Sequence, residues 1–256
     1  MDTKNWKRNL GMIYDLAGLR INLNNRYPFT EKFCGGYLSE DQRSSWDFSV
    51  EVSQDEFFKE REASFCHSDG YVENICLLRS ICRQLPKFGR MLIHAAVVEY
   101  ENEGYAFLGR SGAGKSTHAE LWTQYLPRAK ILNGDKPVLG LEEGRFYAFG
   151  TPWTGKENKG EREKVSLKAL CFLERGKENR LQKLSGKEVS VRLLKQLFLP
   201  SEKEALEATL SLADKLLICV PAYLLRCDIS EGAVKTAFEG MTGGSYVKND
   251  SRRENR

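Results

Sequence analysis

Eight consecutive residues near the middle of the chain limit its possible folds more than any other stretch. They read Gly109-Arg110-Ser111-Gly112-Ala113-Gly114-Lys115-Ser116 and match the phosphate-binding loop (P-loop) pattern of a glycine, any four residues and Gly-Lys-Ser. In such a loop, glycines let backbone N–H groups surround a polyphosphate, the lysine reaches the β- and γ-phosphates, and the serine hydroxyl binds the accompanying magnesium ion. The pattern predicts that the chain binds a nucleotide.

The residues on either side of this stretch have the order that a P-loop needs. Residues 105–108 form an apolar run that is typical of a buried strand. Between Leu121 and Leu126, apolar residues recur at helical spacing, and Pro127 then ends the helix. Strand, glycine-rich loop and helix therefore follow one another, with the positive end of the helix dipole next to the bound anion.

A short connection before the P-loop predicts an unusual sheet. Residues 91–100 are almost continuously apolar and predict one buried strand, and only residues 101–104 separate it from the strand at 105–108. Four residues suffice for a hairpin but not for a parallel crossover, so these strands are predicted to be antiparallel. A tight turn at residues 142–144 predicts a second hairpin. His94, which apolar residues flank, is interpreted as a hydrogen-bonded core histidine.

An acidic residue follows the P-loop at an informative distance. About twenty residues after Lys115, an apolar strand within residues 130–139 ends on Asp135. This is where a magnesium-binding carboxylate is expected beside a P-loop. A loop rich in glycine, lysine and asparagine follows at residues 151–160 and contains Glu157.

Together, the strand with His94, the hairpin, the P-loop, the early acid and the sequence Gly-Thr-Pro-Trp-Thr-Gly-Lys-Glu at residues 150–157 resemble the HPr kinase/phosphorylase-related family. That family shares its nucleotide core with phosphoenolpyruvate carboxykinase. The resemblance covers roughly residues 90–175 and implies an α/β fold with α+β character, in which a mixed, largely antiparallel sheet surrounds the P-loop. It also implies ATP and Mg²⁺ as cofactors, and transfer of the γ-phosphate to a hydroxyl of a peptide, protein or small molecule.

The resemblance also assigns roles to individual residues. Lys115 neutralises phosphate charge during transfer, Ser116 binds the metal, and Thr117 adds a contact to the α-phosphate. Glu157 is a candidate second metal ligand or substitute base. Glu157 also has a plain structural interpretation, as a solvated residue of a flexible loop.

The acidic position departs from the family pattern. The family usually has two adjacent aspartates, one for the metal and one as base, whereas this chain has Gly134-Asp135-Lys136. In one register Asp135 binds the metal and Gly134 replaces the base. In the other, Asp135 is the base and Lys136 replaces the metal ligand. The first register is preferred, because a P-loop is impaired more by loss of its magnesium-binding carboxylate than by loss of the base.

Three parts of the chain are predicted from its patterns. Residues 1–54, which include two alternating stretches, form a small β-rich N-terminal subdomain or an extension of the main sheet. Residues 55–241 form the P-loop kinase-like core, and residues 242–256 form a polar, disordered tail. Within the core, a late helix is predicted to begin at a capping box on Ser201, with a buried stripe at Leu206, Leu210, Ala213 and Leu217.

Composition excludes several other classes of protein. The net charge is +4 with acids and bases interspersed, so the chain lacks the basic stripe of a nucleic-acid-binding protein. The seven cysteines form no Cys-x-x-Cys pair and indicate neither a disulfide framework nor a zinc site. The longest apolar run is too short to cross a bilayer, and no signal peptide is recognisable, so the cytoplasm is the expected compartment.

Two alternatives to an HPr-kinase-like phosphotransferase stay open. A non-catalytic ATP-binding regulatory module is motivated by the missing second aspartate. A small-metabolite P-loop kinase with a parallel sheet is the alternative at the level of the fold, and the hairpin at residues 101–104 argues against it. A carboxykinase proper is disfavoured by the short chain. Neither the phosphate acceptor nor the oligomeric state follows from the sequence.

Overall fold

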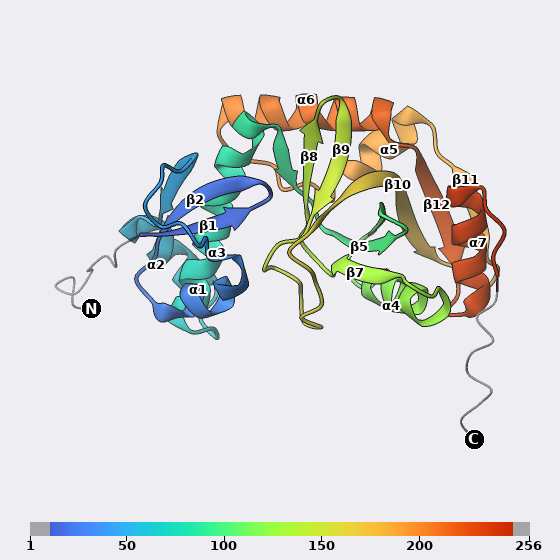
Figure 1. Ribbon diagram of the computed structural model, residues 1–256, viewed down its shortest axis with the longest axis horizontal. Helices are drawn as coiled ribbons and strands as arrows, with labels where there is room; N and C mark the ends of the chain where they lie inside the picture. Colours follow the sequence, from blue (N-terminus) through green and yellow to red (C-terminus); the bar gives the residue numbers. More distant parts are fainter. Residues whose placement is uncertain (1–10, 248–256) are drawn as a thin grey trace, which may run out of the picture.

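A computed structural model of the chain describes residues 11–247, which form two adjoining parts, each built on its own sheet (Figure 1). The first ten residues of the predicted N-terminal part and residues 248–256 of the predicted tail lie outside the described residues. Within residues 11–247, no helix is both long and apolar enough to cross a bilayer.

The N-terminal part is β-rich, with helices packed on its sheet. β1 (Met12–Leu16) and β2 (Leu19–Asn24) form a hairpin, and β3 (Phe48–Glu51) pairs with β2 in parallel. One core joins these strands to the helical segments α1 (Pro28–Phe33), η2 (Gly35–Tyr37), α2 (Gln54–Ala63), α3 (Asp69–Gln84) and η3 (Leu85–Phe88). Residues 54–88 thus pack with the N-terminal strands, and a domain boundary at residue 54 stays a prediction.

The larger sheet carries the glycine-rich stretch. Its strands are β4 (Arg90–Leu92), β5 (Ala95–Tyr100), β6 (Glu103–Leu108), β7 (Lys130–Asn133), β8 (Val138–Glu142), β9 (Arg145–Phe149), β10 (Lys164–Arg175), β11 (Arg180–Lys183) and β12 (Ala222–Cys227). Six of its eight described strand pairings are antiparallel, and only β6 and β12 run parallel to β10. The predicted mixed, largely antiparallel sheet is therefore confirmed, as is the hairpin between β5 and β6.

Helices cover both faces of this sheet. α5 (Gly186–Leu193) and α6 (Lys203–Cys219) pack on one face, and α4 (Lys115–Tyr125) and α7 (Glu231–Thr242) pack on the other. Along β5, Ala95 and Val97 belong to the first core and Ala96 and Val98 to the second, as the alternation of a strand requires. α6 crosses the top of Figure 1 from the end of α3 to α5 and so bridges the two parts.

Two expectations about single elements are wrong. The predicted strand at residues 91–100 is broken at His94, because the backbone there changes partners: β4 pairs with β8, whereas β5 pairs with β6 and β7. α6 begins after Glu202 without a side-chain cap, one residue later than predicted. Its buried side is correspondingly shifted to Ala205, Thr209, Leu212, Ala213 and Leu216, so only Ala213 of the predicted stripe is buried.

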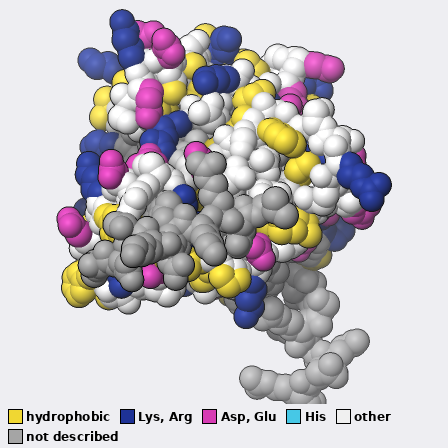
Figure 2. Space-filling model, turned by 90° about the vertical axis from the view of Figure 1, so that its left-hand side faces the viewer, with side chains coloured by type: hydrophobic (Ala, Val, Ile, Leu, Met, Phe, Trp, Pro, Cys, Tyr) yellow, Lys and Arg dark blue, Asp and Glu magenta, His cyan; other side chains and the backbone are white. Residues whose placement is uncertain are grey.

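Charged and apolar side chains are mixed on the face of the N-terminal part that Figure 2 shows. In Figure 2, the visible basic and acidic side chains alternate with apolar ones over this face instead of gathering by sign.

Candidate nucleotide-binding site

Residues 109–116, called the glycine loop below, connect the buried strand β6 to α4. Gly109, Gly112 and Gly114 have φ angles of 151°, 75° and 99°, a backbone region that glycine adopts without strain. A Cβ at Gly109 would lie 2.9 Å from the Cβ of Ala113. The loop thus turns back on itself at positions where glycine is required, and the predicted order of strand, loop and helix is confirmed.

The Lys115 side chain lies across the glycine loop. Its Nζ donates a hydrogen bond to the Gly109 carbonyl oxygen at 3.0 Å, and the residue is only 7% exposed. Burial lowers the pKa of this ammonium, nearby Asp135 opposes that effect, and Lys136 adds to it. The hydrogen bond to Gly109 therefore fixes the position of the Lys115 ammonium group beside the glycine loop.

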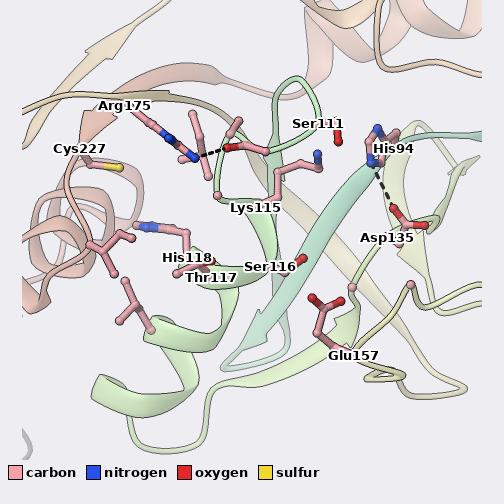
Figure 3. A pocket seen from close by; sticks show the side chains of 18 of the residues that line it. His94, Ser111, Lys115, Ser116, Thr117, His118, Asp135, Glu157, Arg175 and Cys227 are labelled. Carbon is pink, nitrogen blue, oxygen red and sulfur yellow. Dashed lines mark hydrogen bonds and ion pairs between the residues drawn. The ribbon is translucent and has the colours of Figure 1, made fainter.

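A cavity of about 770 Å³, called the first cavity, opens in front of the glycine loop (Figure 3). His94, Asp135 and Glu157 lie at one end of it, and the segment after β12 lies at the other. Its lining also includes residues 111–118, Leu121, Gly134, Gly155, Lys156, Leu173, Arg175, Gly176, Cys227, Asp228 and Ile229. The structure thus brings Lys115, Ser116, Thr117, Asp135 and Glu157 to one cavity, while their roles stay predictions.

His94 lies in this cavity and contacts Asp135. Its Nε2 is 3.1 Å from Asp135 Oδ1, and its side chain is 41% exposed, so the interpretation as a core histidine is wrong. Lys136 Nζ pairs with the other carboxylate oxygen. Burial is the largest influence on the pKa of Asp135 and raises it, but the hydrogen bonds from His94 and Lys136 outweigh burial and lower the pKa to about 2. Asp135 is therefore a carboxylate at neutral pH.

Asn133, which the sequence patterns did not single out, fixes the turn that carries Asp135. Its Oδ1 accepts hydrogen bonds from the backbone N–H groups of Asp135 (2.9 Å) and Lys136 (2.8 Å). Its Nδ2 donates to the carbonyl and hydroxyl oxygens of Thr151, both at 3.1 Å. Asn133 is fully buried, so these bonds have no competition from water. An asparagine two residues before a turn residue is the sequence signal for such an Asx turn.

The backbone on either side of His94 is tied to the same turn. Ile93 N–H donates to the carbonyl of Pro137 (3.1 Å), and Ala95 N–H donates to the carbonyl of Asp135 (3.0 Å). These bonds explain why the strand breaks at His94, and they set its ring opposite the carboxylate.

Gly134 lies beneath the loop at residues 151–160. A Cβ there would be 2.7 Å from the carbonyl oxygen of Thr154, and Gly134 N–H donates to the carbonyl of Lys159 at 3.2 Å. Gly134 is therefore packed against the backbone of that loop. A side chain fits there only if the loop moves.

The loop itself is held from two sides. Arg162 pairs with Asp15 of the N-terminal sheet at 2.9 Å, and Lys159 pairs with Glu120 of α4 at 2.8 Å. Just before these anchors in the chain, Lys156 and Glu157 are exposed and line the first cavity. In Figure 3, Glu157 lies at the same end of the cavity as Asp135, away from Cys227.

The residues present fit a magnesium ion that arrives with a nucleotide. Ser116 offers a hydroxyl and Asp135 a carboxylate, and oxygen ligands of this kind are the ones that Mg²⁺ prefers. Among the described residues, no group of three or more His, Cys, Asp or Glu is placed to hold a metal by itself. Nucleotide-bound Mg²⁺ needs only one or two carboxylates besides the phosphate oxygens.

Comparison with solved structures gives a weak structural likeness. No family model matches the sequence, and no curated protein matches it. Among solved structures, the chain is similar to the Hpr(Ser) kinase/phosphatase from Coxiella burnetii, with a TM-score of 0.34 and 11% sequence identity. The alignment covers 59% of this chain and 99% of that one. The likeness says nothing of which ligand the first cavity accepts.

His118, on the first turns of α4, predicts a pH dependence of stability. Burial lowers its pKa to about 4, and its Nε2 accepts a hydrogen bond from the Trp122 indole at 3.1 Å. In the unfolded chain the pKa is about 6.5, so between these values the unfolded chain binds a proton that the folded chain does not. We expect this residue to lower the free energy of unfolding by about 3 kcal/mol as the pH falls from 6.5 to 4.

Urea denaturation at a series of pH values checks this expectation. His118→Gln keeps an acceptor for the Trp122 indole but does not titrate in this range. Its stability is expected to fall less steeply than that of the wild type below pH 6.5. Parallel curves for the two proteins contradict the prediction.

Proposed function

We propose that the chain is an ATP-dependent phosphotransferase of the HPr-kinase-like kind, which moves the γ-phosphate of ATP to a hydroxyl of a peptide, protein or small molecule. The observation that carries the proposal is the convergence of two features on one cavity. Lys115 lies across the glycine loop, whose three glycines have positive φ angles, and it lines the first cavity. The His94–Asp135 pair lies at one end of that cavity.

In the proposed reaction, the acceptor hydroxyl oxygen bonds to the γ-phosphorus, and the bond from that phosphorus to the β,γ-bridging oxygen breaks. ADP leaves with the electron pair. Lys115 and the N–H groups of the glycine loop hold the phosphate oxygens, since phosphoryl transfer depends mainly on positioning and charge stabilisation. Ser116 and Asp135 would hold Mg²⁺ beside the phosphates, where the ion would neutralise part of the developing charge.

The acceptor proton passes to His94. With Nε2 donating its hydrogen to Asp135 Oδ1, the imidazole has Nδ1 as its free acceptor. Asp135 keeps the ring in that tautomer and stabilises the imidazolium that forms, as the acid does in a hydrolase triad. In this proposal the His94–Asp135 pair does the work of the aspartate that Gly134 replaces, and Glu157 is a further candidate ligand or base.

Binding of a fluorescent ATP analogue with Mg²⁺ tests the nucleotide site. Lys115→Ala is expected to weaken binding by about 10-fold or more and to abolish transfer, because it removes the cation held at the loop. The matched control is Lys187→Ala, an exposed lysine of α5 outside the first cavity. Unchanged ATP binding by Lys115→Ala would exclude this site.

A non-catalytic ATP-binding regulatory module is the second candidate. The close packing of Gly134 against Thr154 favours it, because an acidic side chain beside Asp135 has no room there while the loop keeps this path. Tight ATP binding without turnover on any acceptor supports this candidate. A phosphorylated acceptor found by mass spectrometry excludes it.

A further inference from the structure

A second cavity, of about 820 Å³, lies on the other side of the glycine loop. Ser111, Gly112, Ala113, Leu173 and Arg175 line both cavities, so the crest of the glycine loop and the end of β10 separate the second cavity from the first. The remaining wall is built from the end of β10 and from the residues at and after the end of α5. It consists of Gly109, Arg110, Phe172, Glu174, Arg192, Lys195 and Gln196.

Positive charge exceeds negative charge around this cavity. Its lining contains Arg110, Arg175, Arg192 and Lys195 but only one acid, Glu174. Glu174 is already engaged, since it pairs with Arg192 at 2.7 Å and with Arg226 at 3.3 Å. Within residues 11–247, Arg110 and Lys195 form no ion pair, and Arg175 donates only to the carbonyl of Gly112. An anionic ligand is therefore favoured electrostatically.

A buried amide in the same wall lacks a partner. Gln196 is 8% exposed, and its Oε1 accepts no hydrogen bond from the described residues. Buried side-chain oxygens are normally paired, so this atom is suited to accept an N–H from a ligand. The backbone carbonyl of Gln196 accepts from His94 N–H at 2.8 Å, which places the amide next to the His94 end of the first cavity.

We infer that the second cavity binds the phosphate acceptor, and that the acceptor is an acidic peptide segment in which a serine or threonine is flanked by Asp or Glu. This inference rests on the proposed phosphotransfer function. A peptide supplies both groups that the wall lacks: carboxylates for the unpaired cations and a backbone N–H for Gln196 Oε1. Next to the lining residues on α5 and just after it, Val191 and Leu194 are 58% and 41% exposed, which gives apolar contacts to peptide side chains.

Fluorescence polarisation with two labelled peptides tests the inference, in the presence of Mg²⁺ and a non-hydrolysable ATP analogue. The probes are Glu-Glu-Ser-Glu-Glu and Lys-Lys-Ser-Lys-Lys, each flanked by glycines. The acidic peptide is expected to bind about 10-fold tighter or more. Lys195→Glu is expected to remove that preference, whereas Lys187→Glu, on α5 and outside the cavity, leaves it intact.

Gln196→Leu separates a binding role from a structural one. The substitution removes a buried amide oxygen that has no partner, so the melting temperature is expected to stay unchanged or rise while binding of the acidic peptide weakens. A lower melting temperature with unchanged peptide binding assigns Gln196 to packing and overturns its part in the inference.

The outcomes distinguish this inference from the proposed function. Failure of the wild type to bind the ATP analogue rejects the proposed function itself. If the analogue binds but neither peptide does, or both bind equally, or Lys195→Glu leaves the preference unchanged, the acidic acceptor is rejected and the nucleotide site stands.

Discussion

Replacement of Asp135 by asparagine is expected to lower the rate of phosphoryl transfer by about 10²- to 10⁴-fold. The amide keeps the shape of the side chain and an oxygen for His94 Nε2, but it removes the charge that stabilises the imidazolium and contributes to metal binding. Single-turnover transfer from radiolabelled ATP measures the loss. His94→Ala is expected to be similarly slow, and the double variant no slower than the worse single one, because the two residues act as a unit.

The control for Asp135→Asn is Asp214→Asn, an exposed acid of α6 that lies outside the first cavity. It is expected to transfer phosphate at the wild-type rate. Unchanged transfer by Asp135→Asn contradicts the role of the pair, and additive effects of the two single variants contradict the claim that they act together.

Replacement of Asn133 by leucine is expected to lower the free energy of unfolding by about 2–5 kcal/mol, because each buried group left unpaired costs about 1–3 kcal/mol. The affected groups are the N–H groups of Asp135 and Lys136 and the two oxygens of Thr151. Leucine has a similar volume, so loss of hydrogen bonds and not loss of packing is measured. Urea denaturation gives the value.

Thr151→Val is the matched control for this network. It removes the hydroxyl that accepts from Asn133 and donates to the Lys136 carbonyl at 2.7 Å, and it leaves the Asx turn in place. A loss of about 1 kcal/mol is expected. If Asn133→Leu costs no more than Thr151→Val, the turn is held by packing and the proposed network is not its main support.

The sequence predicted those features that local rules determine. The glycine loop follows from a pattern that few other structures share, and the antiparallel entry of β6 follows from the length of a four-residue connection. Both depend on residues close together in the chain. The largely antiparallel character of the sheet follows from such hairpins, one after another.

The features that the sequence did not predict depend on contacts between residues far apart in the chain. His94 leaves the strand because its neighbours bond to the turn at residues 135–137, and nothing in the apolar run at 91–100 marks that break. The bonds from Asn133 to Asp135 and Lys136 are local, but its bonds to Thr151 form only because the next hairpin brings that residue back to it. The buried side of α6 differs from the predicted stripe because both sides of that helix carry apolar residues. Packing against the larger sheet decides which side is buried.

The tight fit of Gly134 against Thr154 also bears on protein engineering. Since the nearest backbone oxygen would be 2.7 Å from an added Cβ, installation of a second acid by Gly134→Asp requires a redesigned path for the loop in the same step. A screen that changes one position at a time will score every such variant as damaged. To place a second acid beside Asp135, the loop at residues 151–160 must therefore be changed before Gly134 is replaced.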